Sequence, residues 1–518
     1  MRLEYSANSE LPSLAWLASV RSSDAVCSVV HGALVETRAT FFCKGAWAGA
    51  FSAGQLARTE IVFGTGAVIE DAGVLFVSSL ATTDYLYYRV NDALVMVSNS
   101  LALLLAGSDD ALDPQCLSYA AINNSIMAGI VAYERYLPTS RGQVMRLMHS
   151  NLRVGEDGIV EVPKPEPPPF ATFGAYAEYL RNGYAALAAN ARDASRKQRL
   201  RIFSTQSRGY DTTAINGIAA RHGLDGIFTI RTGKGGGSTA SNPDEHEVDD
   251  DGTEIALALG VDRIIGLERR AFAREFNDEL YFHASIHECQ DANLKQVADH
   301  ISAPALLLTG TLGELWYTFA SWYYEREDLI SPDLKRVDLG GHGLTEVRLR
   351  AGYIQAALPF IGARRRADIC AITESHELDP WRLGTSYDRP IPRRLGEEAG
   401  VERASFGQVK VGSVVEFAVP QFPQGRELRA GYFAFLTKEG LLAPWQVRLF
   451  PVVQAINEAV WFASPTNYRP VYYAMRLARK LARREVSGPV IWNRLRGSLF
   501  CFAVNECVGE YRQALERH

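Results

Sequence analysis

The sequence has few cysteines, no long apolar run and little net charge, and each shortage argues against a class of protein. Its 518 residues include seven cysteines, none in a Cys-x-x-Cys pair, so we expect reduced thiols and no zinc site. No stretch of about 18 consecutive apolar residues occurs, which argues against a membrane span. The formal net charge of -5 gives no reason to expect nucleic acid as a partner. The first residues lack the basic and then apolar pattern of a signal peptide, and we expect a cytoplasmic protein.

The composition is that of an ordinary globular protein, with 47% hydrophobic and 22% charged residues. A chain of 518 residues is too long for one hydrophobic core and predicts two domains. A proline-rich run over residues 162–169 marks the boundary, because such a run stays extended and behaves as a semi-rigid linker. We therefore expect one domain over residues 1–162, a linker over 163–169 and a second domain over 170–518.

The two halves differ in their hydrophobic pattern, and together they predict an α/β protein. Before the linker, short apolar runs separated by turn residues predict strands of a layered β-rich domain, with helical segments at 101–105 and 116–122. After the linker, strand and helix signals alternate, which predicts a doubly wound parallel sheet with ligands at the carboxyl ends of its strands. Residues 370–518 have a mostly helical pattern. The expected strands are 26–30, 61–63, 74–79, 94–98, 200–203, 226–232 and 305–309, and the expected helices of the second half are 170–192, 213–221 and 252–259.

The most informative stretch is residues 200–213, LRIFSTQSRGYDTT, where an apolar strand enters a tight loop and then a helix of small residues. Backbone N–H groups, hydroxyls and the helix dipole at such a point favour a phosphate. We expect the phosphate cradle to consist of Ser207, Gly209, Thr212 and Thr213. Asp211 would repel a phosphate by itself, so it suggests a bridging Mg²⁺. An ordinary strand–turn–helix with a capping serine and aspartate is the alternative.

This loop resembles the pyrophosphate loop of the ATP-pyrophosphatase superfamily, whose pattern is Ser-Gly-Gly-x-Asp-Ser. Here the pattern reads Ser-Arg-Gly-Tyr-Asp-Thr over residues 207–212, so Arg208 replaces the first glycine. Glycine lets the backbone approach a phosphate closely. An arginine could instead bind the phosphate through its two-pronged guanidinium, or it could crowd the site.

A second strand end, LLLTGTLGELW over residues 306–316, also enters a glycine-punctuated loop with a carboxylate, Glu314. If strands 200–203 and 305–309 are neighbours, Asp211 and Glu314 converge on one site. Two carboxylates beside phosphate oxygens suit Mg²⁺, which binds through one or two protein carboxylates. The alternative is a simple strand-end cap.

With this segment the chain resembles the asparagine synthetase-like family, which includes β-lactam-forming synthetases and lasso-peptide cyclases, and the resemblance covers nearly the whole chain. The family pattern is Ser-Gly-x-Gly-x-Asp-Glu. Thr309 and Gly310 match its first two positions, Glu314 falls on the Mg²⁺-binding Asp, and Thr311 falls where members carry an acid or a tyrosine. The resemblance also places Lys410 at a lysine that contacts the reacting phosphates, where an ammonium stabilises developing charge. A plain surface lysine is the alternative.

The first half resembles the glutaminase half of these enzymes, on residues 83–88 and 94–101. In that half, a cysteine directly after the initiator methionine releases ammonia from glutamine. Here Arg2 stands in that position, and the first cysteine, Cys27, lies inside a predicted strand. A thiol nucleophile needs exposure and activation. We therefore predict a degenerate, N-terminal-nucleophile-type domain without glutaminase activity.

The resemblance implies a glutamine-independent C–N ligase that uses ATP and Mg²⁺. It would adenylate a small-molecule or peptide carboxylate and transfer the acyl group to a substrate amine, in natural-product or peptide biosynthesis. Lys410, Thr311 and Tyr210 are the candidate catalytic residues, and Arg208 joins the loop residues in binding the nucleotide. The competing hypothesis is a catalytically inactive scaffold subunit of a biosynthetic complex. A homodimer and a biosynthetic partner protein both stay open.

Overall fold

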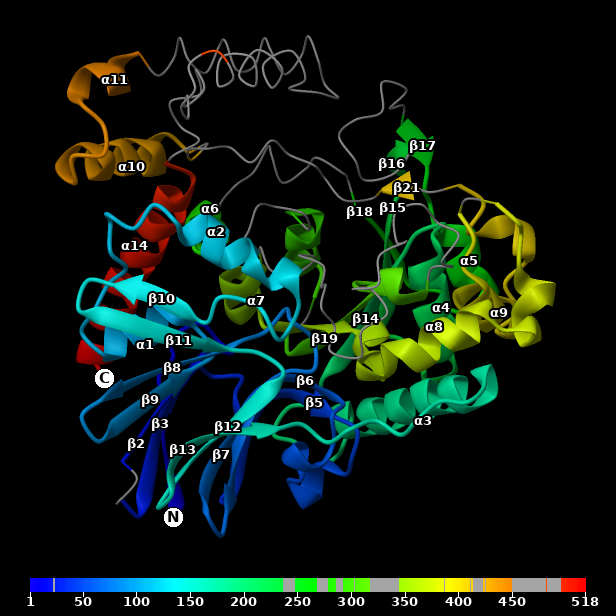
Figure 1. The fold of residues 1–518 in the computed structure, drawn as a ribbon, viewed down its shortest axis with the longest axis horizontal. Helices are drawn as coiled ribbons and strands as arrows, with labels where there is room; N and C mark the ends of the chain where they lie inside the picture. The colour runs from blue at the N-terminus through cyan, green and yellow to red at the C-terminus, as the bar shows by residue number, and fades with distance from the viewer. Residues whose placement is uncertain are drawn as a thin grey trace.

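The computed structural model describes residues 1–21, 24–235, 247–267, 278–285, 292–301, 303–316, 344–385, 387–409, 411–412, 423, 425–449, 481 and 495–518. Over these residues the chain is a mixed α/β protein with sheets of seven, six, five and three strands (Figure 1). The expected α/β class is therefore confirmed at this level.

The first half of the chain forms the seven-stranded and the six-stranded sheets, which share an apolar cluster. Trp16, Ala18 and Val20 alternate along β2 and enter this cluster, as does Phe76 from the other sheet. The strands expected over 26–30 and 94–98 occur as β3 and β9. The order of the seven-stranded sheet is β1(Arg2–Ala7), β3(Val26–His31), β2(Trp16–Arg21), β9(Leu94–Ser98), β8(Leu86–Asn91), β11(Gly142–Leu147), β10(Tyr136–Thr139). That of the six-stranded sheet is β13(Gly158–Pro163), β12(Ser150–Gly155), β7(Gly73–Val77), β6(Val62–Glu70), β5(Phe41–Trp47), β4(Glu36–Thr37).

The five-stranded sheet is parallel throughout, as the alternating pattern predicted. The chain runs outward from β14 through β15 to β18, and then returns to the other side of β14 with β19 and β20. The strand order therefore reverses between β14 and β19, which is the topological switch point where open α/β sheets bind ligands. The order across the sheet is β18(Ile264–Leu267), β15(Gly226–Ile230), β14(Arg201–Gln206), β19(Ala305–Thr309), β20(Tyr353–Ala357).

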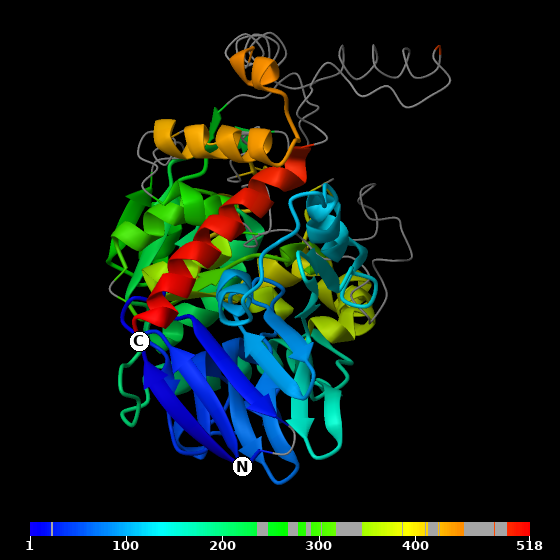
Figure 2. The same cartoon turned by 90° about the vertical axis from the view of Figure 1, so that its left-hand side faces the viewer.

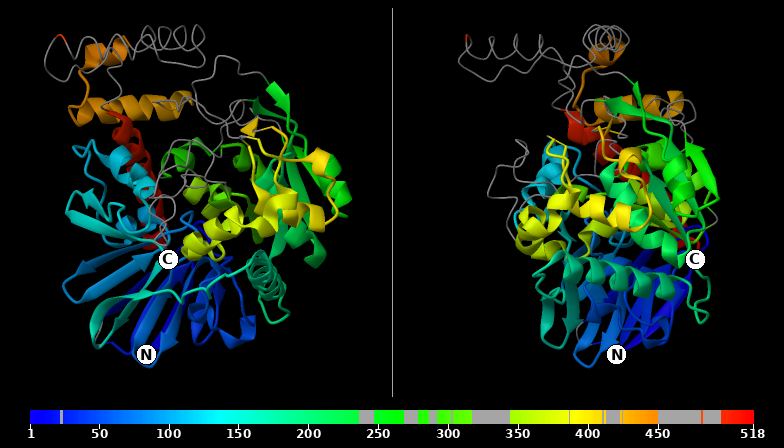
Figure 3. Two further views of the ribbon diagram at one scale, coloured as in Figure 1. Left: turned by 45° about the vertical axis from the view of Figure 1, so that its right-hand side comes forward. Right: turned by 90° about the vertical axis from the view of Figure 1, so that its right-hand side faces the viewer.

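Apolar side chains cover both faces of this parallel sheet. Ile202 and Leu306 belong to the cluster that includes α3(Phe173–Ala191) and α4(Tyr210–Ala219), whereas Phe203 and Leu307 enter a separate cluster on the other face. Burial on both faces explains why β19 reads as a continuous apolar run. Helix α3 contacts both β5 and β14, so it lies between the two halves of the molecule (Figure 3).

Further helices follow the parallel sheet, and the last one returns to the first half of the chain. Helix α14(Arg496–Glu516) packs against α1(Leu101–Gly107), as Figure 2 shows. The largest apolar cluster accordingly contains residues from both sides of the proline-rich run. The other α-helices within the described residues are α2(Tyr119–Asn124), α5(Thr253–Ala258), α6(Glu279–His283), α7(Thr345–Ala351), α8(Arg366–Glu374), α9(Pro390–Glu398), α10(Arg426–Lys438) and α11(Pro444–Arg448). A small sheet has the order β17(Glu247–Asp249), β16(Thr232–Gly235), β21(Val411–Gly412).

The proline-rich run is packed against the second half of the chain. Lys164 is buried, and its carbonyl accepts a hydrogen bond from Arg364 Nη1 at 3.2 Å. Arg365 Nε donates to the carbonyl of Pro167 at 2.9 Å. These contacts with the second half of the chain hold the run in place.

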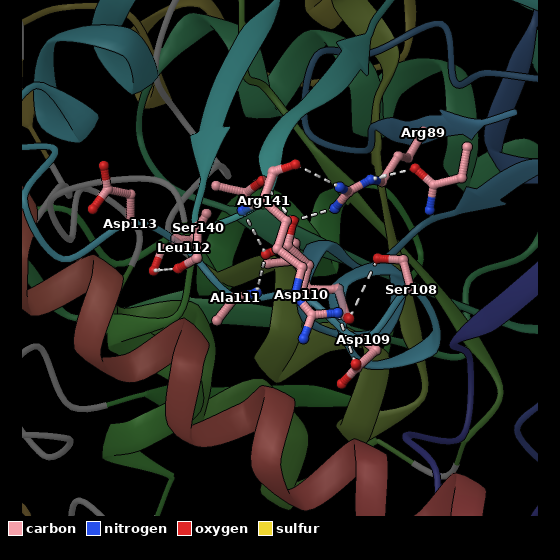
Figure 4. Close-up of polar contacts among 12 residues, drawn as sticks. Arg89, Ser108, Asp109, Asp110, Ala111, Leu112, Asp113, Ser140 and Arg141 are labelled. Atoms are coloured by element: carbon pink, nitrogen blue, oxygen red, sulfur yellow. Dashed lines mark hydrogen bonds and ion pairs between the residues drawn. The ribbon is translucent and has the colours of Figure 1, made fainter.

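A polar network around Asp110 ties α1 to the edge of the seven-stranded sheet (Figure 4). The buried carboxylate pairs with Arg89 and accepts hydrogen bonds from the Thr139 hydroxyl at 2.6 Å and from the N–H of Ala111 at 2.8 Å. The carbonyl of Asp110 accepts a bond from Arg512 on α14 at 3.4 Å. Four segments of the chain thus meet at one residue. Over the whole described part of the chain, no helix is long and apolar enough to cross a membrane.

Candidate functional site

The two loops that the sequence singled out meet at the switch point of the parallel sheet. Strands β14 and β19 are neighbours in parallel register, with Ser204 opposite Leu308, which confirms the pairing on which the predicted site depended. A Cβ atom added at Gly313 would lie 2.1 Å from Cγ of Asp211, and one at Gly310 would lie 2.7 Å from its Cβ. Asp211 therefore packs directly against the backbone of the second loop, which leaves room only for glycine at these two positions.

The first loop ends at the start of helix α4, whose first turn also carries Asp211. Helix α4 begins at Tyr210 with Gly209 as its N-cap, and among the described residues no side chain makes the capping hydrogen bond. The first N–H groups of a helix have no partner within the helix and attract negative charge. The Ser207 and Thr212 hydroxyls lie 3.1 Å apart beside this helix start.

The hydroxyls of the loop accept hydrogen bonds from backbone N–H groups of the same loop. The N–H of Gly209 donates to Ser207 Oγ at 3.0 Å, and the N–H of Ser207 donates to Thr212 Oγ1 at 3.1 Å. A phosphate would have to exchange these internal bonds for its own oxygens. Because a hydroxyl can turn from accepting to donating, Ser207 and Thr212 retain the chemistry that the sequence assigned to them.

Thr213 and Tyr210, two other predicted site residues, are fully buried beneath the loop. Thr213 Oγ1 donates to the carbonyl of Gly209 at 2.8 Å. The Tyr210 hydroxyl accepts from Arg393 Nη2 at 2.6 Å, and its ring lies 4.9 Å from that of Tyr387. Burial raises the pKa of the Tyr210 phenol, and the bond from Arg393 offsets this only in part. In this structure both side chains pack in the protein interior next to the loop and do not face an open site.

Arg208, which replaces the first glycine of the loop pattern, directs its side chain to acids outside the loop. Its guanidinium pairs with Asp249 at 2.9 Å and with Glu254 at 3.5 Å, and the side chain is 38% exposed. Its backbone N–H donates to Asp250 Oδ1 at 3.0 Å. Of the two roles considered for this arginine, crowding of the phosphate position is not what the structure shows, and binding of phosphate would require the guanidinium to leave these acids.

Arg389 is a component of the site that sequence reasoning did not assign. It lies one residue before α9, its side chain has 0% exposure, and its Nη1 pairs with the carboxylate of Asp211. The same nitrogen donates to the carbonyl of Gly313 at 3.3 Å. One buried cation therefore joins the acid of the first loop to the backbone of the second. An arginine before a helix-starting proline carries no local signal of such a role.

Thr311 and Glu314 lie on the second loop. Thr311 Oγ1 is 3.1 Å from Thr309 Oγ1 and accepts from Gln355 Nε2 at 3.4 Å. Glu314 is half-buried on the single turn Gly313–Trp316, directly after the glycine that touches Asp211. Lys410, the third predicted catalytic residue, lies outside the described residues.

The donor set fits Mg²⁺ together with phosphate and does not form a metal cage by itself. In the described ranges, no group of three or more His, Cys, Asp or Glu side chains could hold a metal ion. Asp211 and Glu314 lie on the two adjoining loops, and two carboxylates are the usual number when phosphate oxygens and water complete the shell of Mg²⁺. The pair between Asp211 and Arg389 would have to open for this, and that competition is testable.

The first half of the chain carries no activated thiol at the positions considered. Cys27 lies on β3 with 0% exposure, and burial raises its pKa to about 12. Arg2 is exposed at the start of β1 and pairs with Glu4 at 2.7 Å. A protonated, buried thiol is a poor nucleophile.

No protein-family model matches this sequence, and no curated protein matches it at a significant level. Membership of the asparagine synthetase-like family therefore stays a prediction.

Proposed function

We propose that this chain is an ATP-dependent C–N ligase that joins a carboxylate to an amine through an acyl-adenylate. The observation that supports it most is the contact between the start of α4 and the Gly310–Gly313 loop at the switch point between β14 and β19. A helix start beside two carboxylates at such a point suits a Mg²⁺-bound polyphosphate. An ATP-consuming reaction also suits the cytoplasmic location that we propose.

In the first step, an oxygen of the substrate carboxylate attacks the α-phosphorus of ATP, and the bond from that phosphorus to the bridging oxygen breaks. Pyrophosphate leaves with the electron pair of that bond. We assign the leaving phosphates to Ser207, Gly209, Thr212 and the start of α4, which offer N–H and hydroxyl donors to the charge that develops. Mg²⁺, when bound, would neutralise part of this charge.

The cations of the site have distinct roles in this proposal. Asp211 and Glu314 would hold Mg²⁺, and Arg389, once separated from Asp211, would face the same phosphates as a fixed charge. Lys410 is the further cation that the family resemblance implies. Thr311 would orient the substrate by hydrogen bonding, because a threonine hydroxyl does not act as a base near neutral pH.

In the second step, the nitrogen of the amine attacks the acyl carbon, and the bond from that carbon to the adenylate oxygen breaks. AMP leaves with the electron pair, and the amine gives up a proton. With Cys27 buried and its thiol protonated, we assign the amine to the substrate itself or to a second molecule and not to glutamine. This favours small-molecule or peptide biosynthesis.

The test is exchange of labelled pyrophosphate into ATP, with purified protein, Mg²⁺ and a panel of carboxylic acids and peptides. Exchange that depends on one acid and is lost in Asp211→Asn would support adenylation and identify the acid. The matched control is Asp249→Asn, which removes a nearby carboxylate that is 60% exposed and bound to Arg208. Absence of exchange with every acid, together with no ATP binding by calorimetry, would refute the ligase.

The second candidate function is a non-catalytic scaffold subunit, and one observation favours it. The buried Arg389 already neutralises Asp211, as expected for a site that no longer binds metal. A scaffold predicts that Mg²⁺ and ATP together leave the melting temperature unchanged. The ligase predicts a rise, because ligand binding to the folded state stabilises it by mass action.

A further inference from the structure

A line of buried polar contacts runs from the N-terminal sheets toward the loop after β19. It begins at Lys44 on β5, whose Nζ lies 2.6 Å from Asp84 Oδ1 in the turn before β8. Both side chains are at most 2% exposed. Arg348 of α7 continues the line, with Nη2 4.0 Å from Asp84 Oδ1 and 2.6 Å from the carbonyl of Thr83, to which it donates.

The second part of the line ends at the candidate site. Arg348 Nη1 donates to Gln355 Oε1 at 3.1 Å. The amide nitrogen of Gln355 donates in turn to Thr309 Oγ1 at 3.2 Å and to Thr311 Oγ1 at 3.4 Å. These two threonines flank Gly310, the residue that packs against Asp211.

The charges on this line are costly to bury. Desolvation lowers the pKa of Lys44, although Asp84 opposes the shift. Apolar side chains of similar volume often replace a buried ion pair without loss of stability, whereas removing one partner of the pair is destabilising. A line of this kind is therefore better explained by the geometry that it imposes than by its contribution to stability. The contact between β6 and β20 places it where the two halves of the molecule join.

We propose that Arg348 and Gln355 are positioning residues for the strand-end site, and that the N-terminal sheets support this site through Lys44 and Asp84. A displacement of Gln355 releases Thr309 and Thr311, and with them the backbone that holds Asp211 in place. The degenerate first half of the chain then acts as a structural brace for the second. The relevance to ligation rests on the proposed function, whereas the bracing itself does not.

The test compares two buried lysines of the first half in the full-length protein. Lys44→Met breaks the start of the line. Lys164→Met is the matched control, because it removes an equally buried amine that donates to the carbonyl of Ser78 at 2.6 Å and lies off the line. The readout is amide hydrogen exchange of peptides covering residues 305–316. We expect exchange at least about tenfold faster in Lys44→Met, and a change below about twofold in Lys164→Met.

Gln355→Leu and Thr309→Val test the other end of the line and should speed exchange of the same peptides, so the proposal stays testable if Lys44→Met does not fold. Equal exchange in Lys44→Met and Lys164→Met, or unchanged exchange in Gln355→Leu and Thr309→Val, would overturn it. If the wild-type protein has adenylating activity, Gln355→Leu should lower kcat, and Gln355→Asn, which keeps the amide, should restore part of it. A wild type without ATP binding would refute the ligase and leave the exchange comparison valid.

Discussion

The pair between Asp211 and Arg389 allows a prediction whose size follows from the structure. Asp211→Asn keeps the shape of the side chain, which the close contact with Gly313 requires. It removes the negative charge of Asp211 from beside a guanidinium with 0% exposure. Removing one partner of a buried ion pair costs about 3–5 kcal/mol. The asparagine oxygen and the Gly313 carbonyl remain as acceptors, and Asp211 is 20% exposed, so we expect a loss of about 2–3 kcal/mol.

The assay should report on this part of the molecule alone, because a chain with several apolar clusters need not unfold in one step. Hydrogen exchange of peptides from β14 and β19 measures the free energy of local opening. A loss of 2–3 kcal/mol corresponds to exchange about 30- to 150-fold faster. Asp249→Asn breaks the exposed pair with Arg208 and should change exchange less than about fivefold.

A double-mutant cycle isolates the pair from the rest of the site. Once Arg389→Met has removed the cation, Asp211→Asn should cost less, with a coupling energy of about 1–2 kcal/mol. Two single effects that add within about 0.5 kcal/mol would refute the pair as a source of stability. An Asp211→Asn protein that exchanges no faster than the Asp249→Asn control would refute it as well.

Three further predictions concern other parts of the molecule. Gly313→Ala drives a methyl group into the carboxyl of Asp211, so it should weaken Mg²⁺–ATP binding at least about tenfold by calorimetry, whereas Gly266→Ala on β18, which meets no atom within 4 Å, should not. Burial lowers the pKa of Lys164 to about 7 in the folded protein, whereas the pKa of a lysine in the unfolded chain is about 10.4. Between pH 7 and pH 9 the unfolded chain therefore binds more protons than the folded protein, and the free energy of unfolding should rise by about 2 kcal/mol. The melting temperature of the wild type should rise over this pH range, and that of Lys164→Met should not. An equal dependence of melting temperature on pH in the two proteins would contradict the assignment to Lys164. Asp110→Asn replaces the carboxylate in the network of Figure 4 by an amide, whose NH₂ group cannot accept the hydrogen bonds that the carboxylate accepts. The free energy of unfolding should therefore fall by about 2–4 kcal/mol. A melting temperature equal to that of the wild type would count against this network.

Local patterns were enough to predict several strands and helices. Strands were expected over 94–98 and 305–309, and β9 and β19 have these bounds. The helix expected over 170–192 occurs as α3, where the Thr172 side chain accepts from the N–H of Ala175 at 3.2 Å and marks the start. Apolar runs, turn residues and caps act within a few residues of each other, so the sequence carries them directly.

The roles of individual site residues were harder to predict. Tyr210 belongs to the loop that the sequence singled out, yet its surroundings come from Tyr387, Arg393 and Phe406. Those residues lie 177 to 196 positions further along the chain, and nothing near Tyr210 signals them. Its side chain is therefore buried where the loop pattern predicted a site-lining residue.

The sequence by itself determined the alternation of strands and helices, the two glycine-containing loops with their acids, and the helix start that can attract an anion. Only the tertiary structure decided that β14 and β19 are neighbours, and that Arg389 balances Asp211 across 178 positions. It also decided that Gln355 joins the second loop to Arg348, which lies beside Asp84. The physical reason is range. Backbone conformation responds to neighbouring residues, whereas charge pairing depends on strand order and on what each buried group finds beside it.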